Sequence, residues 1–410
     1  MFDITGQKRW GIIGDGQLAR MLALDAYALG LRPVVLTGDS SSPAGQVSPL
    51  VVRGHVDSRE DLHALLSQVD GAIIESEFVD CDALEATGLA EKVYPRTGAI
   101  RILQNKFEQK KLLESLGVKS SSFYPLDKKN MEGAVASLTH NFTKPIVLKF
   151  ATFGYDGKGV LVLRGSGQRD QDLAGDFLLT ATKRRIDVYA EDFVGFYREL
   201  AMIAVRGRDG TIKTWPLVIT EQKSGVCERV TGPAVSLGIK KEIETEAQIA
   251  CEKIGANLGL VGVFAVEFFL TSSGDLLVNE IAPRVHNSGH FSQNAGCMSQ
   301  FENHWRAVLG LSLGRTDTAP FFMMQNLLGP AEVTSKDCAQ APRGAESMHV
   351  HWYGKRGISP GRKLGHLNAV SHSLDNRGDV ISAVQSAYGR WQEEQRQIFL
   401  NAQTAQKGPL

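Results

Sequence analysis

The sequence predicts an α/β domain at the N-terminus, an α+β region in the middle and a small domain at the C-terminus. Strand-like and helix-like segments alternate over residues 1–103, and a glycine-rich turn at 154–159 lies between two strand-like segments. Short apolar segments bounded by turn residues then recur as far as Ile281. Alternating strands and helices are typical of a parallel sheet, whereas hairpins indicate a mixed or antiparallel one. We therefore expect divisions at 1–103, 104–334 and 335–410.

Within the N-terminal domain, each predicted strand is followed by a predicted helix or a turn. Apolar residues at helical spacing follow the cluster Gly14-Asp15-Gly16, and Gly30 is a plausible helix stop. Such an order favours parallel strands joined by right-handed crossovers. The predicted strands are Trp10–Ile13, Pro33–Leu36 and Gly71–Ile74, and the predicted helices are Leu18–Leu29 and Glu60–Leu66.

The remaining elements predict a helix, then a hairpin, then further short strands. The helix closes at Gly117, and the tail from Trp391 is glutamine-rich and helix-like. The predicted helix is Lys106–Leu116, and the predicted strands are Pro145–Lys149, Val160–Leu163, Arg198–Val205, Val263–Leu270, Leu276–Ile281 and His349–Tyr353.

Composition limits the class of protein. The 410 residues carry 45 Lys plus Arg against 45 Asp plus Glu, which argues against a nucleic-acid partner. No apolar segment reaches the roughly 18 residues that a membrane span needs, and no apolar signal core precedes the first strand, so we expect a cytoplasmic protein. The five widely spaced cysteines favour reduced thiols over a disulfide framework or a zinc ribbon: Cys81, Cys227, Cys251, Cys297 and Cys338.

The first glycine cluster, Gly14-x-Gly16-x-x-Ala19, lies at a strand-to-helix junction. Free amides at a helix N-terminus attract phosphate, and glycines let the backbone approach a ligand. Asp39 follows at about the distance where a dinucleotide-binding fold places its ribose carboxylate. Phosphate binding and a tight turn without a ligand both remain open. A nicotinamide-dependent oxidoreductase fits this cluster but leaves the later motifs without a function.

The segment Lys149–Lys158 suits polyphosphate binding. A lysine ends an apolar strand, and a glycine-rich hairpin with Asp156 and Lys158 follows it. A fixed cation can lie under the phosphates while a mobile flap excludes water. The spacing is not that of a Walker sequence. A surface hairpin with solvated lysines is the alternative.

Glu267 and Glu280 are the predicted metal ligands. The strands that carry them flank the turn Ser272–Asp275. If the hairpin centres on Ser273-Gly274, the two glutamates lie opposite each other with Cβ atoms roughly 5 Å apart. Apolar neighbours on both faces make such a pair costly unless a cation bridges it, and Mg²⁺ is the natural candidate. Asn279 could add a neutral oxygen, whereas a slipped register would leave one glutamate solvated.

A dense set of donors follows directly: Arg284, His286, Asn287 and His290. Beside a metal site, such donors could hold a small anion against a phosphoryl group. Three weaker groups are open to both ligand-binding and structural interpretations. They are Glu75-Ser-Glu77 after the third predicted strand, Glu191 with Glu199, and the basic clusters Tyr353-Gly-Lys355 and Arg362–His366.

Taken together, these motifs resemble ATP-grasp ligases of the 5-(carboxyamino)imidazole ribonucleotide synthase family. The resemblance covers Gly11 to about Leu367 and is most specific at 154–159, 279–284, 286–290, 299–302 and 362–366. It implies an ATP-grasp fold with a Rossmann-like N-terminal domain, a lid at about 120–188 and a small C-terminal domain. It also implies a homodimer that uses ATP, Mg²⁺ and bicarbonate to carboxylate the amine of aminoimidazole ribonucleotide in purine biosynthesis.

Position by position, the resemblance implies four groups of site residues. ATP would contact Lys106, Lys110, Lys149, Lys158, Glu191, Phe193, Val194, Glu199 and Asn279, and Mg²⁺ would be held by Glu267 and Glu280. The ribonucleotide would contact Gly16, Gln17, Leu18, Glu75, Tyr155, Asp156, Lys355 and Arg362. Arg284, His286 and Asn287 would cradle bicarbonate or carboxyphosphate, with Lys149 and Asp156 also catalytic.

The sequence departs from the family at several positions near the presumed site. Asp15 replaces a glycine, and Gln104-Asn-Lys106 replaces Gln-Asp-Arg. The remaining replacements are Ile219, Thr220 and Gln222, where the family has Glu, Asn and His, and Ser292-Gln-Asn294, where it has Thr-Ile-Asp/Glu. These changes leave two alternatives open: a ligase for a different amine acceptor, or a nucleotide-binding paralogue without catalysis.

Overall fold

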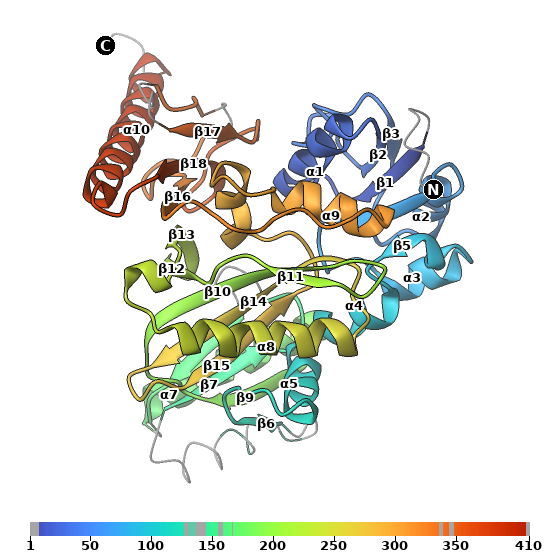
Figure 1. The fold of residues 1–410 in the computed structure, drawn as a ribbon. Helices are drawn as coiled ribbons and strands as arrows, with labels where there is room; N and C mark the ends of the chain where they lie inside the picture. Colours follow the sequence, from blue (N-terminus) through green and yellow to red (C-terminus); the bar gives the residue numbers. More distant parts are fainter. Residues whose placement is uncertain are drawn as a thin grey trace.

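The computed structural model describes residues 8–126, 145–154, 159–165, 167–335, 339–343 and 348–406, together with Asn130, Gly133 and Val135. In Figure 1 the N-terminal sheet lies at the upper right and the second sheet in the lower part, while the third sheet extends from the lower part into the C-terminal region at the upper left. No helix in this described part combines the length and apolar character needed to cross a bilayer.

The first sheet has five parallel strands in the order β3-β2-β1-β4-β5, as the predicted α/β domain requires. Gly71–Ile74 is the fourth strand along the chain rather than the third, because the short strand Val51–Arg53 precedes it. Side chains of Ser58 and Asp80 cap α2 and α3. The elements are β1 Arg9–Ile13, α1 Gln17–Ala28, β2 Arg32–Thr37, β3 Val51–Arg53, α2 Arg59–Leu66, β4 Gly71–Ile74, α3 Cys81–Ala86, η1 Ala90–Lys92, β5 Val93–Tyr94 and α4 Thr97–Gln104.

The second sheet has four antiparallel strands in the order β6-β9-β7-β8. The predicted hairpin around the glycine-rich turn is confirmed, since β7 pairs with β8 up to Lys149 opposite Val160. One face packs on α7 through Leu148, Ala190 and Leu178. The elements are α5 Lys106–Ser115, β6 Phe123–Pro125, β7 Ile146–Phe150, β8 Val160–Leu163, α7 Gln168–Arg184 and β9 Val188–Asp192.

The third sheet is antiparallel and runs from the central region into the C-terminal region. Its order is β15-β14-β10-β12-β13-β16-β18-β17, with β11 paired to β10. The elements are β10 Phe196–Arg206, β11 Ile212–Thr214, β12 Val218–Lys223, β13 Val226–Gly232, η2 Val235–Leu237, α8 Lys241–Asn257, β14 Gly262–Thr271, β15 Leu276–Ala282, η3 Asn287–Gln293, α9 Gln300–Leu309, β16 Phe321–Leu328, β17 His349–Trp352, β18 Lys363–Ser371 and α10 Arg377–Gln406.

The two faces of this sheet belong to different cores. Val266 and Phe268 face a core with α8, whereas Ala265 faces a core that also contains α1 and α9. In that second core the Trp305 indole packs edge-on against Trp10, with ring centroids 5.8 Å apart, and its N–H donates to the Leu22 carbonyl at 2.8 Å. These contacts fix the N-terminal domain against the central sheet.

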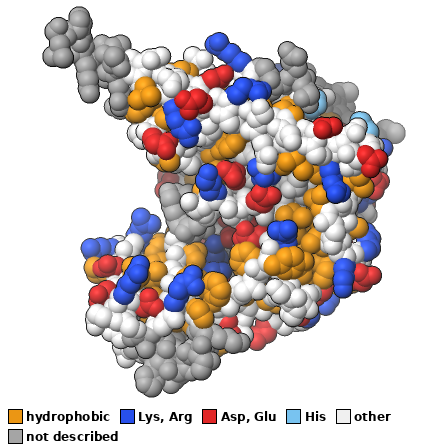
Figure 2. Space-filling model, turned by 90° about the vertical axis from the view of Figure 1, so that its left-hand side faces the viewer, with side chains coloured by type: hydrophobic (Ala, Val, Ile, Leu, Met, Phe, Trp, Pro, Cys, Tyr) orange, Lys and Arg blue, Asp and Glu red, His pale blue; other side chains and the backbone are white. Residues whose placement is uncertain are grey.

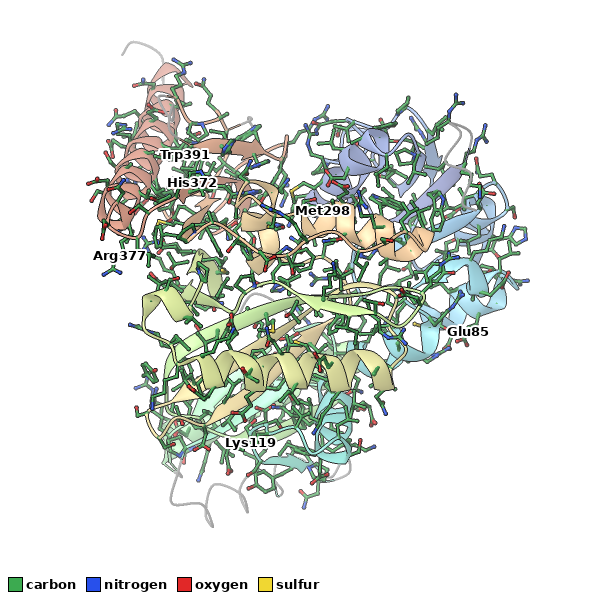
Figure 3. The ribbon with its side chains drawn as sticks, in the orientation of Figure 1. Glu85, Lys119, Met298, His372, Arg377 and Trp391 are labelled. Carbon is green, nitrogen blue, oxygen red and sulfur yellow. The ribbon has the colours of Figure 1, made fainter. Side chains whose placement is uncertain are left out.

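The C-terminal region packs α10 against β16 and β18. Trp391 of α10 is 1% exposed, contacts the core of Leu327, Leu364 and Leu367, and donates its indole N–H to the Gln340 carbonyl at 2.8 Å (Figure 3). The helix-like tail predicted from Trp391 is confirmed, although the helix begins earlier, at Arg377.

Figure 2 shows a face of the molecule that is hollowed between an upper and a lower lobe, with acidic and basic side chains around the hollow.

Candidate active site

The predicted pairing of Glu267 with Glu280 is confirmed, but not for the whole hairpin. Glu267 lies opposite Glu280, whereas nearer the turn Phe268 lies opposite Val278, so Asn279 is an extra residue on β15. The register predicted from a turn centred on Ser273-Gly274 is therefore wrong by one residue near the turn, and a β-bulge restores it at the glutamates. The bulge places Asn279 and Glu280 on the same face of the sheet as Glu267, because Val278 and Ile281 on either side are buried in the core under α8.

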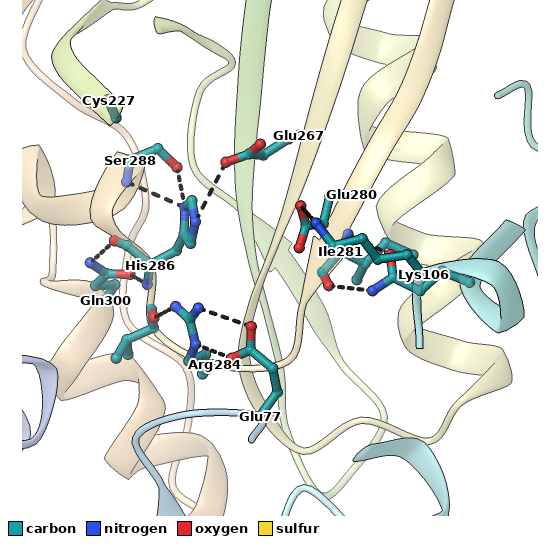
Figure 4. A network of polar contacts seen from close by, with 12 residues as sticks. Glu77, Lys106, Cys227, Glu267, Glu280, Ile281, Arg284, His286, Ser288 and Gln300 are labelled. Atoms are coloured by element: carbon teal, nitrogen blue, oxygen red, sulfur yellow. Dashed lines mark hydrogen bonds and ion pairs between the residues drawn. The ribbon is translucent and has the colours of Figure 1, made fainter. Parts of the chain in front are cut away.

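The two carboxylates already have partners in the protein. The Lys106 ammonium lies 2.7 Å from Glu280 Oε2, and His286 Nε2 lies 3.5 Å from Glu267 Oε1 (Figure 4). Burial, and then the neighbouring Glu280, raise the pKa of Glu267. This face of the hairpin therefore concentrates negative charge that the surrounding side chains offset only in part.

These residues fit a magnesium ion. Two opposed carboxylates, each about one third exposed, repel each other without a cation, and Asn279 adds a neutral oxygen on the same face. Among the described residues no group of three or more acidic, histidine or cysteine side chains surrounds one point. Mg²⁺ commonly uses only one or two carboxylates together with substrate phosphates, so the pair suffices.

A buried cluster of two lysines and a glutamate lies between the second sheet and β15. Lys149 Nζ lies 3.0 Å from Glu191 Oε2 and 3.2 Å from Asn279 Oδ1, and Lys110 Nζ lies 3.4 Å from Glu191 Oε1. Hydroxyl groups of Ser121 and Tyr189 donate to the same carboxylate, each at 2.7 Å. The predicted phosphate ligands Lys110 and Lys149 thus share one carboxylate. Lys149 also contacts Asn279, the residue before Glu280.

The pKa values of Glu191 and Lys110 are both lowered, but for different reasons. Burial would raise the pKa of Glu191, but Lys149 and Lys110 outweigh it and hold that pKa at about 2. Burial lowers the pKa of Lys110 to about 8, and Glu191 opposes this only in part. The two shifts differ because the glutamate has two cations, whereas Lys110 shares its carboxylate with Lys149.

The predicted donor set after β15 divides: His286 contacts Glu267 and Arg284 contacts Glu77, whereas His290 is buried against Gln300 and His366. Arg284 forms a two-point ion pair with Glu77, whose carboxylate accepts from Nε and, at 3.1 Å, from Nη2. The His286 ring contacts Ser288 Oγ at 2.9 Å on its Nδ1 side. Burial, and then the charge of Arg284, lower the pKa of His286 well below its ordinary value, so the ring is neutral. The Asn287 amide nitrogen is buried and has no partner within the described residues.

The N-terminus of α1 is covered by the predicted ligand Glu75. The Gly16 amide donates to its carboxylate at 2.9 Å. A Cβ atom on Gly14 or Gly16 would meet that carboxylate, and Gly14 also has a φ of +119°, so both positions need glycine. Gln17 and Leu18 open the helix directly beyond.

Of the two predicted basic clusters of the C-terminal region, the one around Lys355 contacts the N-terminal domain, and Arg362 contacts the loop that follows Lys355. The Gln46 side chain bridges from the N-terminal domain to the Gly354 carbonyl at 2.7 Å. Lys355 lies over the Tyr353 ring, and Arg362 donates to the Arg356 carbonyl at 2.7 Å. The structure thus brings Lys355 and the opening of α1 to one side of the molecule.

The remaining predicted ligands differ in position, and the charge of Glu199 acts on Glu267. Phe193 and Val194 follow β9, with Phe193 exposed, and Glu199 on β10 has a pKa raised by burial. Tyr155, Asp156 and Lys158 lie outside the described residues.

Comparison with known proteins identifies the family. A model of the ATP-grasp domain matches residues 111–301, and a model of the ribonucleotide synthetase preATP-grasp domain matches residues 7–104. A model of the phosphoribosylaminoimidazole carboxylase C-terminal domain matches residues 323–378. The N5-carboxyaminoimidazole ribonucleotide synthase of Bacillus subtilis is 37% identical over 368 residues, which are 89% of this chain and 92% of that protein. The chain belongs to the N5-carboxyaminoimidazole ribonucleotide synthase family.

Other members of the family are similar to this chain over nearly its whole length. The N5-carboxyaminoimidazole ribonucleotide synthase of Mycobacterium leprae is 34% identical, over 93% of this chain and 89% of that protein. The carboxyaminoimidazole ribonucleotide synthase from Aspergillus clavatus, solved with ATP, superimposes with a TM-score of 0.83 at 31% identity, over 94% of this chain and 99% of that one. These comparisons confirm the predicted family, the ATP-grasp fold and the ligase class.

The departures from the N5-carboxyaminoimidazole ribonucleotide synthase pattern have different surroundings. Asp15 accepts a hydrogen bond from the Thr37 hydroxyl, so its charge has a local partner. Ile219 is buried in the core under α8, away from the glutamates, whereas Thr220 lies opposite Glu199. Asn294 Oδ1 contacts His351 Nε2 at 2.7 Å and accepts from Asn368 at 2.8 Å.

Two further departures have simpler consequences. Gln222 lies at the exposed end of β12. Lys106 replaces an arginine and retains the cation that neutralises Glu280.

Sequence reasoning did not identify the partners that hold these residues. Glu77 belongs to the group Glu75-Ser-Glu77, which is open to ligand binding or a structural role, and Gln300, which contacts the His286 backbone, lies in the segment 299–302 of the resemblance. Ser121 and Tyr189 were not singled out. The position of Glu77 at the carboxyl end of a parallel strand was the one available signal. Its partner is 207 residues away, which no local pattern could reveal.

Proposed function

We propose that this protein uses ATP and bicarbonate to carboxylate the exocyclic amine of 5-aminoimidazole ribonucleotide. The observation that supports this most directly is the pair Glu267 and Glu280, with Arg284 and the neutral His286 beside it. A relative from Aspergillus clavatus was solved with ADP and aminoimidazole ribonucleotide, at 30% identity and a TM-score of 0.81.

In the first step, an oxygen of bicarbonate forms a bond to the γ-phosphorus while the bond to ADP breaks. Lys110 and Lys149 hold the phosphates, and Arg284 offsets charge that develops on the oxygens. When bound between Glu267 and Glu280, Mg²⁺ would supply further charge neutralisation at the phosphates. His286, whose ring contacts Glu267, and Asn287 beside it would orient the bicarbonate.

In the second step, the amine nitrogen bonds to the carboxyl carbon and phosphate leaves. The amine proton passes to a base, for which Asp156 is our candidate from the sequence. Gly16, Gln17, Leu18, Lys355 and Arg362 would hold the ribonucleotide phosphate, and Glu75 its ribose. Carboxyphosphate hydrolyses readily, so proximity of the two reactants and exclusion of water are essential.

The test is release of ADP with ATP, Mg²⁺, bicarbonate and aminoimidazole ribonucleotide, each omitted in turn. We expect release to need every component and the carboxylated product to form in equal amount. Release that needs bicarbonate but ignores the ribonucleotide would favour a different amine acceptor. Nucleotide binding without any release would favour a non-catalytic paralogue.

We further propose that the protein acts in the cytoplasm as a homodimer, without nucleic-acid or membrane partners. Light scattering after size-exclusion chromatography tests the dimer, and a mass of one 44.6 kDa chain would contradict it.

A further inference from the structure

Arg284 is held by a carboxylate from another domain. It follows β15 in the ATP-grasp region, whereas Glu77 follows β4 in the N-terminal domain (Figure 4). The Glu77 side chain is 8% exposed and that of Arg284 is 17% exposed. Both oxygens of Glu77 are used, one on Nε and one on Nη2, which is the two-point geometry that fixes the plane of a guanidinium.

This pairing determines which donors of Arg284 are left for a ligand. A third N–H, on Nη1, donates to the Val285 carbonyl at 3.2 Å. A guanidinium has five N–H groups, so within the described part of the chain one remains on Nη1 and one on Nη2. Two such donors suit two oxygens of a planar oxyanion such as bicarbonate.

The backbone of Glu77 is itself held by the side chain of Gln104. The Gln104 side chain donates to the backbone carbonyls of both Glu77 and Val79. Two residues further, Lys106 forms its ion pair with Glu280. The short segment from Gln104 to Lys106 therefore ties the Glu77 loop to the strand that carries the paired glutamates.

The surroundings of Arg284 explain why it needs such a partner. Besides Glu77, the carboxylates of Glu75 and Glu280 also act on its charge. Without Glu77, a long and flexible side chain would turn toward one of these two, and would then cover either the ribonucleotide site or the metal site.

We propose that Glu77 is a positioning residue, which orients Arg284 so that its two remaining N–H groups receive bicarbonate. This inference rests on the proposed function and adds a residue that acts through Arg284 rather than on the substrate. Its effect should therefore be specific to bicarbonate.

The test compares Glu77→Gln and Glu77→Asp with the wild type in bicarbonate-dependent ADP release. Glu77→Gln should raise the KM for bicarbonate about tenfold or more and leave the KM for ATP within about twofold. Glu77→Asp keeps the charge and should recover part of the loss, which also covers the case that the glutamine variant fails to fold. Asp82→Asn neutralises an exposed arginine partner in the same domain and should change neither constant.

The same Glu77 substitution made in an Arg284 variant separates a positioning role from a structural one. In Arg284→Lys, which cannot form the two-point pair, Glu77→Gln should add less than about a twofold further loss in kcat/KM for bicarbonate. Equal losses in both backgrounds, or a parallel rise in the KM for ATP, would overturn the inference. If wild-type ADP release ignores bicarbonate, the proposed function fails and this inference with it. If the wild type responds and both Glu77 variants match it, only this inference fails.

Discussion

At the scale of single residues, the site is a set of buried and half-buried charges whose partners come from other parts of the chain. Glu280 has Lys106, Glu267 has His286, and Glu191 has two lysines. These contacts constrain one another, because a change to one of the residues alters the balance of charge and hydrogen bonds at its partner. Substitutions that keep shape and remove charge are therefore the most informative.

Glu280→Gln should reduce turnover by at least about a hundredfold, because the amide replaces one of two anionic ligands for Mg²⁺. Circular dichroism and the melting temperature should change little, since Lys106 retains an oxygen acceptor. Asp275→Asn, at the exposed tip of the same hairpin, is the matched control. An active Glu280→Gln enzyme with an unchanged magnesium requirement would contradict the metal assignment.

The KM for ATP should rise as the pH rises through about 8. Lys110 is charged below that pKa and neutral above it, so its contribution to phosphate binding is present at low pH and lost at high pH. Lys110→Met should have a raised KM for ATP at pH 7, and this KM should not rise further between pH 7 and pH 9. A wild-type KM that stays level over this range, or a pH step retained in Lys110→Met, would refute the assignment.

The paired glutamates could be predicted to lie close together because both lie in one hairpin, but alternation from the observed turn alone would pair Glu267 with Asn279, and the bulge that brings Glu280 opposite Glu267 could not be predicted. The partners of Arg284 and Glu191 could not, because they come from other sheets. A carboxylate such as Glu77 looks the same in sequence whether it binds a ribose, a solvent molecule or an arginine.

At the scale of elements, the bulge in β15 determines what the hairpin presents. Regular alternation would put Asn279 and Glu280 on opposite faces, whereas the bulge puts both beside Glu267. The extra residue therefore adds an oxygen and a contact to Lys149 without moving the metal pair.

Deletion of Asn279 should consequently keep the pairing of Glu267 with Glu280. We expect the variant to retain its magnesium requirement and to lose about two- to tenfold in kcat/KM for ATP, because Lys149 loses one of its contacts. Asn279→Ala should behave in the same way. Loss of all activity in the deletion, together with normal activity in Asn279→Ala, would show that the bulge is needed to hold the register.

Some elements with a clear local pattern could be predicted closely, whereas the shortest strands could not, and neither the buried strand β16 nor the long helix α8 was predicted. The predicted strand Gly71–Ile74 matches β4, whereas β3 and β5 have three and two residues and were missed. Elements this short owe their conformation to neighbours in the sheet rather than to their own pattern.

At the scale of the whole molecule, the proposed ribonucleotide site depends on two ends of the chain. The opening of α1 and the loop around Lys355 are held near each other by Gln46 and the Gly354 carbonyl. Neither half offers the full set of donors alone. The motifs suggested the two halves separately, and only the resemblance assigned them to one site.

Arg362→Gln should raise the KM for aminoimidazole ribonucleotide about tenfold or more, because it removes a cation from the phosphate site. The KM for ATP should stay within about twofold. Arg390→Gln, on the exposed surface of α10, is the control. Equal changes in both constants would place Arg362 outside the ribonucleotide site.

The pairing of β13 with β16 also governs how such a chain can be divided. The ATP-grasp match ends at residue 301, yet the sheet continues through β16 and β18. A shortened chain that ended after α9 would leave β13 as an edge strand with unpaired backbone groups, which promotes aggregation. The central and C-terminal regions are thus not independent domains. Fusions and truncations are better made at the ends of the chain than at the border between these regions.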